Sequence, residues 1–230
     1  MKIAHVVDTL EIGGAERLVV TMAEIQRTKG HLVEVHCVMR SGPLASELKS
    51  LGVAVYDNHA TTTVGRIRAL TTEFRRTRPE VVHFHNATAA IYGSIAALMA
   101  RVPARISTRH GLVPPKRNSS TEMKFWMTAR LTDFAVAVSH QTRENMLSFP
   151  LADPDKLRVI VNGCSPAATN GHGALLRTPG FTFIHVARLN AVKDQSTLLR
   201  AFAQATEAVG NVRLLIVGDG PKRRELEQLA

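Results

Sequence analysis

Short apolar runs alternate with helix-length segments along most of this chain, and this alternation limits its fold more than any other feature. We expect strands where the apolar residues are nearly continuous, at 3–7, 33–39, 53–56, 81–85, 105–108, 134–139 and 157–161. We expect helices where apolar residues recur every three or four positions, at 15–28, 44–51, 67–77, 89–101, 120–131 and 141–147. Strands of this kind are typical of a parallel sheet with helices on both faces. The pattern predicts an α/β fold, with a doubly wound, Rossmann-like domain.

The alternation stops at 162–179, where Gly, Asn, Pro and small residues indicate a linker. It restarts with strands expected at 181–187 and 212–217, a helix at 196–209 and a final helix opening at Pro221. We therefore predict an N-terminal domain over 1–165, a linker over 166–180 and a second domain over 181–230. Two strands and two helices are too few to cover both faces of a parallel sheet, so we expect the second domain to be incomplete and the chain to be cut short.

Composition excludes several other classes of protein. With 230 residues, 45% hydrophobic and 21% charged, the chain is not intrinsically disordered. Its two cysteines lack the spacing of a metal site or a disulfide framework, and Cys37 lies in an apolar run that predicts a buried, reduced thiol. The first residues do not form a signal peptide, and the longest apolar run, 87–100, is too short to span a bilayer. We expect a cytoplasmic protein.

The net charge of +10 is concentrated in one stretch. Residues 66–130 hold twelve basic and three acidic side chains, so nine of the ten net positive charges lie there. Cations beside an aromatic residue can bind an anionic membrane surface, which would place the protein peripherally on the inner face of the membrane. The alternative is a solvated helix face with the tryptophan in the core. The membrane-surface candidates are Arg75, Arg76, Lys116, Arg117, Lys124 and Trp126.

The first motif that could carry chemistry is Gly13-Gly14-Ala15-Glu16, between the first strand and its helix. Glycines allow close approach of a ligand, and a helix N-terminus attracts phosphate through its dipole and its unpaired N–H groups. The motif lacks the spacing of a dinucleotide fingerprint, so a tight turn without a ligand remains an equal alternative.

The second motif is Arg109-His110-Gly111, at the end of the fifth strand. Ligands of open α/β sheets bind beyond the carboxyl ends of the strands, so His110 could contact a substrate hydroxyl there and Gly111 could leave room for it. His83 and His85 end the preceding strand at the same edge, and both could instead be buried strand histidines. Because the histidines look scattered and lack supporting carboxylates, we expect no metal.

The third motif lies in the second domain, where Arg188 follows a strand and Lys193 precedes the next helix. Two cations at the carboxyl end of a strand can neutralise a diphosphate, although exposed loop cations without a ligand are common. Gly218-Asp219-Gly220-Pro221 follows the next strand at the same edge and reads as a turn before a helix.

Taken in order, six motifs resemble the family-4 retaining glycosyltransferases. The motifs are Gly13–Glu16, the Arg-His-Gly at 109–111, Val-Ser-His around Ser139, Asn162-Gly163, ARLNAVKD at 187–194 and VGDGP at 217–221. The family has the GT-B fold, in which two Rossmann-like domains face a cleft. The resemblance implies a transferase that moves a sugar from a nucleotide diphosphate-sugar to a glycan or lipid-linked acceptor, as in cell-envelope polysaccharide synthesis.

The resemblance also implies roles for individual residues. Gly14 would lie at the phosphate region of the donor, His110 would orient the transferred sugar as the catalytic residue, and Arg188 and Lys193 would hold the diphosphate. No cofactor or metal is implied. The other cleft candidates are Gly13, Glu16, His85, Gly111, Asn162 and Gly218.

The chain departs from the family in two places. Cys164 and Ser165 follow Asn162-Gly163 where the family usually has an aspartate, and the acidic motif that grips the donor ribose and sugar would lie beyond residue 230. Two alternatives therefore stay open: a non-catalytic fragment, and an α/β protein that binds phosphate or nucleic acid. Against nucleic acid, the chain has 5% aromatic residues and no RNA-reading motif, so we expect no such partner.

Overall fold

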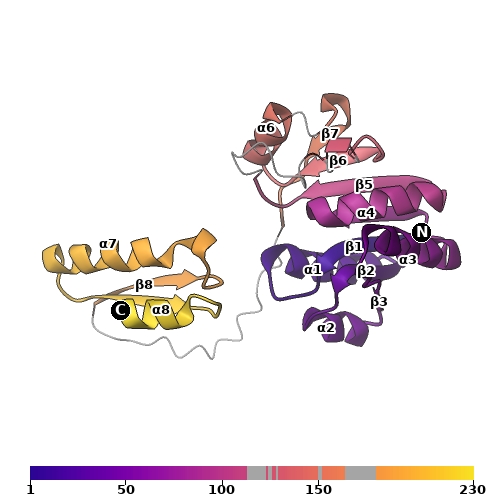
Figure 1. Ribbon diagram of the computed structural model, residues 1–230. Coiled ribbons are helices and arrows are strands. Elements are labelled where there is room, and N and C mark those ends of the chain that lie inside the picture. Colours follow the sequence, from indigo (N-terminus) through magenta and orange to yellow (C-terminus); the bar gives the residue numbers. More distant parts are fainter. Residues whose placement is uncertain (113–122, 124–125, 128, 150–151, 164–179) are drawn as a thin grey trace. The chain divides into compact units, whose positions relative to one another are not determined.

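The computed structural model describes residues 1–112, 123, 126–127, 129–149, 152–163 and 180–230 (Figure 1). The chain forms two compact units, Met1–Ser165 and Pro166–Ala230. The expected linker at 166–180 lies outside the described residues except for Gly180.

The first unit is built on one seven-stranded sheet. Every neighbouring pair of strands is parallel, and the spatial order is β3-β2-β1-β4-β5-β6-β7. Their bounds are β1 Lys2–Thr9, β2 Leu32–Arg40, β3 Ala54–Asp57, β4 Val81–His85, β5 Ala104–Arg109, β6 Phe134–Ala137 and β7 Leu157–Val159. All seven strands expected from the apolar runs are present, so the doubly wound parallel sheet is confirmed.

Helices cover both faces of this sheet. Helices α1 (Gly14–Thr28) and α2 (Leu44–Ser50) enclose one buried cluster, and α3 (Thr63–Thr77) and α4 (Asn86–Met99) enclose the other (Figure 1). Side chains of β1 alternate between the two clusters: Val6 packs on the α3 and α4 side, and Val7 packs on the α1 and α2 side. A further helix, α6 (His140–Ser148), packs against β6 and β7.

Two helices begin earlier than the sequence indicates. Helix α3 begins at Thr63 rather than at 67 because the Thr62 hydroxyl accepts a hydrogen bond from the Gly65 N–H at 3.0 Å. Helix α4 begins at Asn86, directly after β4, rather than at 89. The helix expected at 120–131 falls mostly outside the described residues, and those described at 123, 126–127 and 129 are helical.

A buried ionic network lies between β2 and α3. The Glu34 side chain is 3% exposed and accepts a hydrogen bond from Thr77 Oγ1 at 2.7 Å. Its two oxygens also lie 3.0 Å from His36 Nε2 and 3.3 Å from Lys2 Nζ. Burial raises the pKa of Glu34, but the hydrogen bonds from His36 and Thr77, together with the charge interactions with His36 and Lys2, outweigh burial and leave this pKa below its usual value. The carboxylate is therefore ionised in the folded protein.

The second unit pairs β8 (Phe181–Val186) with β9 (Val212–Val217) in parallel. A 3₁₀ turn (Ala191–Lys193) and helix α7 (Gln195–Ala208) follow β8, and helix α8 (Arg223–Leu229) follows β9. The last helix begins two residues after Pro221, because residues 221–222 form a turn. Among the described residues of this unit only Leu189, Gln195 and Leu226 are buried, so its own core is small.

Candidate functional site

The order of strands in the first unit marks one edge as the place for a ligand. The chain runs outward from β1 to β2 and β3, then returns to β4 and continues in the other direction through β5 to β7. Open α/β sheets bind ligands outside the carboxyl ends of the strands at such a reversal. The segments that follow β1, β4 and β5 therefore form the candidate site of this unit.

The glycine loop after β1 leads directly into helix α1. Gly13 has extended backbone angles and occupies the N-cap, and no described side chain caps the helix there. Gly14 is the first helical residue, and a Cβ placed on it would meet no described atom within 4 Å. Packing does not require glycine at 14, so the absence of a side chain leaves open space in front of the helix N-terminus. Glu16, in the first turn, is half-buried.

Asp8, near the end of β1, is a site residue that sequence reasoning missed. Burial raises the pKa of its carboxyl group from 3.8 to about 6, and hydrogen bonds from the Ala89 N–H and the Thr88 side chain only partly oppose this effect. The charge of Glu16 adds to the increase, so both carboxyl groups belong to this edge of the sheet. One oxygen of Asp8, Oδ1, is buried and has no hydrogen-bond partner among the described residues.

The raised pKa of Asp8 predicts a pH-dependent gain in stability on Asp8→Asn. A carboxyl group with a folded pKa above its unfolded value stabilises the fold fully below pH 3.8 and loses this contribution as pH rises through about 6. The variant should therefore raise the free energy of unfolding by about 2–3 kcal/mol at pH 8 and by little at pH 3.5. Urea unfolding at both pH values measures the difference, with Asp155→Asn, at an exposed position, as the control. Equal effects at both pH values would show that the folded protein does not raise the pKa of Asp8.

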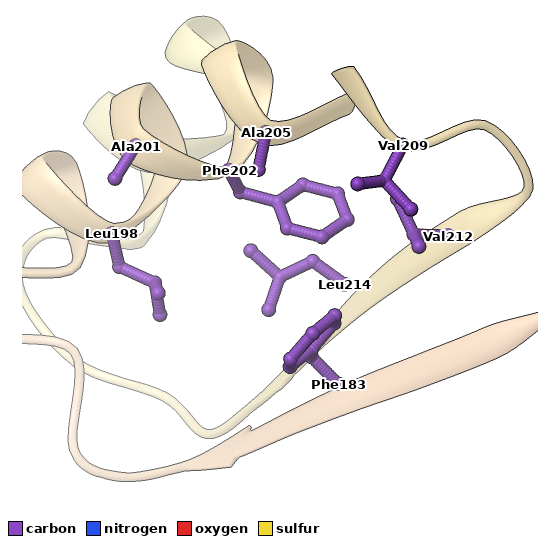
Figure 2. A pocket seen from close by; sticks show the side chains of 8 residues that line it. All are labelled: Phe183, Leu198, Ala201, Phe202, Ala205, Val209, Val212 and Leu214. Carbon is purple, nitrogen blue, oxygen red and sulfur yellow. The ribbon is translucent and has the colours of Figure 1, made fainter. Parts of the chain in front are cut away.

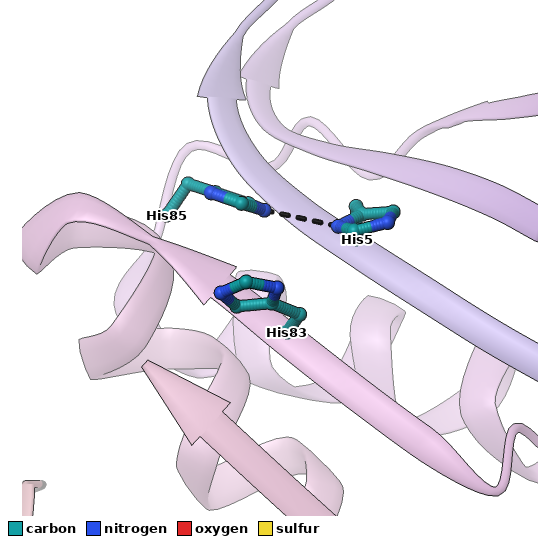
Figure 3. Close-up of side chains that lie close together, drawn as sticks. All are labelled: His5, His83 and His85. Carbon is teal, nitrogen blue, oxygen red and sulfur yellow. Dashed lines mark hydrogen bonds between the residues drawn. The ribbon is translucent and has the colours of Figure 1, made fainter. Parts of the chain in front are cut away.

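Four histidines lie close together on the α1 side of the sheet: His5 in β1, His83 and His85 in β4, and His110 directly after β5. His5 Nδ1 lies 3.0 Å from His85 Nε2, and His85 Nδ1 lies 3.0 Å from His110 Nε2. His83, which is half-buried, lies beside them, with its ring centre 4.2 Å from that of His85 (Figure 3). The sequence placed His85 and His110 at one edge, and the structure brings them into contact; His5 was not singled out.

The histidine rings are uncharged near neutral pH. Burial lowers the pKa of His5, lowers the pKa of His83 and His85 much further, and lowers the pKa of His110 to about 4. Neighbouring histidines add to the decrease for His83 and His85, because a second positive charge in the cluster would be repelled. Each neutral ring has one nitrogen that donates and one that accepts.

His110 is held by its backbone as well as by its ring. Its N–H donates to Asn86 Oδ1 at 3.3 Å. Asn86 itself has a φ of 68°, a left-handed conformation that asparagine tolerates better than most residues. Gly111 follows His110 and is exposed, and a Cβ on it would meet no atom within 4 Å in the part of the chain that the structure describes. Among the described residues, no atom therefore fills the space next to the Gly111 Cα.

The grouping of histidines corrects one expectation. From the sequence we expected scattered histidines. In the structure, each of His5, His83 and His85 has one ring nitrogen within 4.8 Å of those of the other two, a spacing at which a metal ion could be bound. His5 Nδ1 and His85 Nε2 share a hydrogen bond, so one of them carries a proton and cannot act as a ligand at the same time. The arrangement is that of a hydrogen-bonded chain, and the expectation of a metal-free site remains a prediction.

In the second unit, Arg188 and Lys193 lie in the segment that joins β8 to α7. Both side chains are exposed. Asn190 caps the 3₁₀ turn by accepting a hydrogen bond from the Lys193 N–H at 3.2 Å, and the buried Gln195 donates to the Arg188 carbonyl at 3.0 Å. The backbone that carries the two cations is thus fixed by two side chains from its own segment.

Two glycines after β9 let a second loop pack against this segment. A Cβ on Gly218 would overlap the carbonyl oxygen of Ala187, and a Cβ on Gly220 would overlap that of Leu189. The Leu189 N–H also donates to the Asp219 carbonyl at 2.9 Å. The Gly-Asp-Gly motif is thus a packing element, and Gly218 supports the loop of Arg188 and Lys193 through its backbone.

The second unit also has an apolar groove, which does not include Arg188 or Lys193. It has a volume of about 300 Å³ and runs between α7 and the two strands (Figure 2). Val209 and Val212 close it beside the start of β9, whereas Arg188 follows the end of the parallel strand β8. Its lining side chains are all apolar: Phe183, Leu198, Ala201, Phe202, Ala205, Val209, Val212 and Leu214. Such a lining does not suit a diphosphate.

The remaining candidates divide by location. Asn162 and Gly163 are exposed beyond β7, and Cys164 lies outside the described residues. Of the membrane-surface candidates, Lys116, Arg117 and Lys124 also lie outside them. The structure describes the other three. Arg75 donates to the Met99 carbonyl at 3.1 Å, and Arg76 pairs with Glu73. Trp126 is half-buried against the cluster that α3 and α4 enclose, and the Arg130 guanidinium lies over its ring.

Cys37 is buried and free, as expected, and burial raises the pKa of its thiol to about 12.

Comparisons with known proteins match the whole length of the chain. The family model for Glycosyltransferase Family 4 matches residues 12–168, and that for Glycosyl transferases group 1 matches residues 173–230. A curated relative from Escherichia coli, UDP-Gal:alpha-D-GlcNAc-diphosphoundecaprenol alpha-1,3-galactosyltransferase, is 25% identical over 99% of this chain and 64% of its own length. A phosphatidylinositol N-acetylglucosaminyltransferase polypeptide from Arabidopsis thaliana is 27% identical over 73% of this chain and 38% of its own length.

Solved structures share the fold. Anabaena HepE in complex with UDP matches with a TM-score of 0.78 and 20% identity, over 100% of this chain and 65% of that chain. UDP-GlcNAc 2-epimerase from Methanocaldococcus jannaschii matches with a TM-score of 0.63 and 11% identity, over 100% and 68%. The fold is GT-B, with one Rossmann-like unit and part of a second. The chain spans about two thirds of the length of HepE and of the E. coli relative. No described helix is long and apolar enough to cross a bilayer.

Proposed function

Because the chain belongs to glycosyltransferase family 4, we propose that it transfers a sugar from a nucleotide diphosphate-sugar to an acceptor, with retention of configuration. The family match over residues 12–168, more than half of the chain, carries this proposal. The fold would not carry it alone, since a UDP-GlcNAc 2-epimerase has the same fold. The match also favours an enzyme over a nucleic-acid-binding protein.

The donor diphosphate is the group that this chain is best equipped to bind. Arg188 can bind two phosphate oxygens through its planar guanidinium group, and Lys193 adds a compact positive charge. Open space in front of Gly14 allows a ligand to approach the N-terminus of α1, whose unpaired N–H groups favour an anion. Stabilising the departing diphosphate weakens the bond to the sugar, which is the main catalytic effect that we assign to these residues.

His110 is the residue that we assign to the transferred sugar. Its ring is neutral near pH 7, so one of its nitrogens can accept a hydrogen bond from a sugar hydroxyl. Retention follows if the acceptor attacks on the face from which the diphosphate leaves. This course needs neither an enzymic nucleophile nor a metal ion.

We propose a lipid-linked acceptor at an anionic membrane surface. The E. coli relative is named for an acceptor with a diphosphoundecaprenol group, and residues 66–130 carry nine of the ten net positive charges. Sedimentation with vesicles tests this proposal: binding should be stronger to anionic than to neutral vesicles and should weaken with salt. Equal binding to both kinds of vesicle would contradict it.

Donor binding can be tested with a thermal-shift screen of the complete gene product against UDP-, GDP- and ADP-sugars. A ligand present at 100 times its Kd stabilises the folded state by about 2.7 kcal/mol, so a true donor should raise the melting temperature by several degrees. Inorganic diphosphate at the same concentration serves as the control for binding of charge alone. The absence of a shift with all three classes of donor would contradict the proposal.

A further inference from the structure

A continuous chain of hydrogen bonds connects helix α1 to the candidate sugar site. Gln26, on the buried side of α1, places Oε1 2.8 Å from His5 Nε2. His5 Nδ1 lies 3.0 Å from His85 Nε2, and His85 Nδ1 lies 3.0 Å from His110 Nε2. His5 and His85 are fully buried at 0% and 2% exposure, so water does not compete for these contacts.

The row of hydrogen bonds has a direction because the atom of Gln26 that faces His5 is Oε1, a carbonyl oxygen that can only accept. The Gln26 carbonyl oxygen requires a proton on His5 Nε2, which leaves His5 Nδ1 as an acceptor. His85 must then donate from Nε2 to His5 and accept at Nδ1, and His110 must donate from Nε2 to His85. The remaining nitrogen, His110 Nδ1, is left with a lone pair.

This last nitrogen has no partner in the described part of the chain, although it is buried. A buried acceptor without a hydrogen bond is costly, by about 1–3 kcal/mol, and such atoms commonly await a ligand. A second feature points in the same direction, since Gly111 leaves open space next to His110.

We propose that Gln26, His5 and His85 are positioning residues that fix the tautomer of His110, so that its Nδ1 accepts a hydrogen bond from one hydroxyl group of the transferred sugar. The assignment of the ligand rests on the proposed function, whereas the fixed tautomer does not. Gln26 acts without touching the substrate, through two intervening rings. A reversed tautomer would present an N–H at the same place, and a sugar hydroxyl there would have to accept rather than donate the hydrogen bond.

The tautomers can be read directly by long-range ¹H–¹⁵N NMR of the imidazole rings in this chain, with no donor present. The His110 signal is identified by its loss in His110→Gln. We expect the wild-type His110 to carry its proton on Nε2. Gln26→Met, which removes the hydrogen-bonding group, should give a mixture of His110 tautomers, and Gln26→Glu, which keeps an acceptor, should restore the wild-type state. Thr28→Met, at an exposed position of the same helix, should change nothing.

A second readout tests the sugar. Because only part of the Gln26→Met molecules keep the accepting tautomer of His110, kcat/KM of this variant should fall by up to about 10-fold. Among donors that each lack one hydroxyl, one should abolish the difference between the wild type and this variant, because that donor has no hydroxyl to give to His110. A proton on His110 Nδ1 in the wild type, or a His110 tautomer that Gln26→Met does not change, would show that Gln26, His5 and His85 do not fix this tautomer. If the tautomer is fixed as proposed but Gln26→Met changes the use of no donor, the hydroxyl of the transferred sugar is not the ligand of His110.

Discussion

Replacing Arg188 and Lys193 together with alanine will weaken binding of the nucleotide diphosphate-sugar by at least about 100-fold. In the proposed site each cation would donate charge-assisted hydrogen bonds to phosphate oxygens, worth about 1.5–3 kcal/mol, and about 1.4 kcal/mol corresponds to a tenfold change in affinity. Stability should change little, since both side chains are exposed. Calorimetric titration of the complete gene product with its donor measures the affinity directly.

The control for this variant is the pair Arg200→Ala and Arg213→Ala. Arg200 is exposed on α7, and Arg213 is exposed near the start of β9, at the opposite end from the Gly218 loop. This double variant removes the same charge from the same unit, so it should leave donor affinity within a factor of about two to three of the wild type. Equal loss in the two double variants would show that net charge, and not a diphosphate site, attracts the donor.

Glu34→Ala will produce the largest loss of stability that we expect from a single substitution in the first unit. The variant leaves His36 and Lys2 without their carboxylate, in a place where Glu34 is only 2% exposed. Removing one partner of a buried ion pair costs about 3–5 kcal/mol, which is a large fraction of the stability of a typical domain. Urea unfolding at pH 7, followed by circular dichroism, measures the free energy of unfolding.

The effect of Glu34→Ala should depend on pH in a defined direction. The folded pKa of Glu34 is lowered, so its stabilising contribution is present above its unfolded value of 4.5 and is lost as pH falls through the folded pKa. The difference between the variant and the wild type should therefore narrow below pH 4.5. Glu47→Ala removes a half-exposed partner of Arg17 and should cost no more than about 1 kcal/mol. Similar losses in both variants at pH 7 would contradict the importance of the buried network.

The fold was predictable from the sequence because its strands are nearly uniform in their apolar character. The runs at 3–7 and 81–85 correspond to β1 and β4, and the structure extends the first by one residue before it and two after. Helix ends were harder to predict, because single side chains decide them. Thr62 adds four residues to the expected start of α3, and Ser139 caps α6 by accepting a hydrogen bond from the Thr142 N–H at 3.0 Å.

The candidate site was predictable only in part. The sequence placed His85 and His110 at one edge, because carboxyl ends of parallel strands share an edge. It gave no reason to connect them with His5 or Gln26, since that connection depends on β1 lying beside β4 and on α1 lying over β1. The spacing of His83 and His85 was the available signal for a histidine cluster, because two residues that are two positions apart lie on the same face of a strand.

Asp8 and Gly14 show two further limits of sequence reasoning. A single aspartate at the end of a strand is common, and only its burial and its partnerless oxygen distinguish it here. For Gly14, the sequence left a tight turn and a ligand site equally open. The structure shows that packing among the described residues does not require glycine there, since no described atom lies within 4 Å of a Cβ built on Gly14, and the ligand site stays a prediction.

Sugar transfer with retention is tested most directly by following the anomeric proton of the donor by NMR. The complete gene product is incubated with the donor found by thermal shift and with a polyprenyl diphosphate-linked sugar in anionic vesicles. The donor should be consumed, and the transferred sugar should carry the same anomeric configuration in the product as in the donor. An inverted product, or no consumption of any nucleotide diphosphate-sugar, would contradict the proposed reaction.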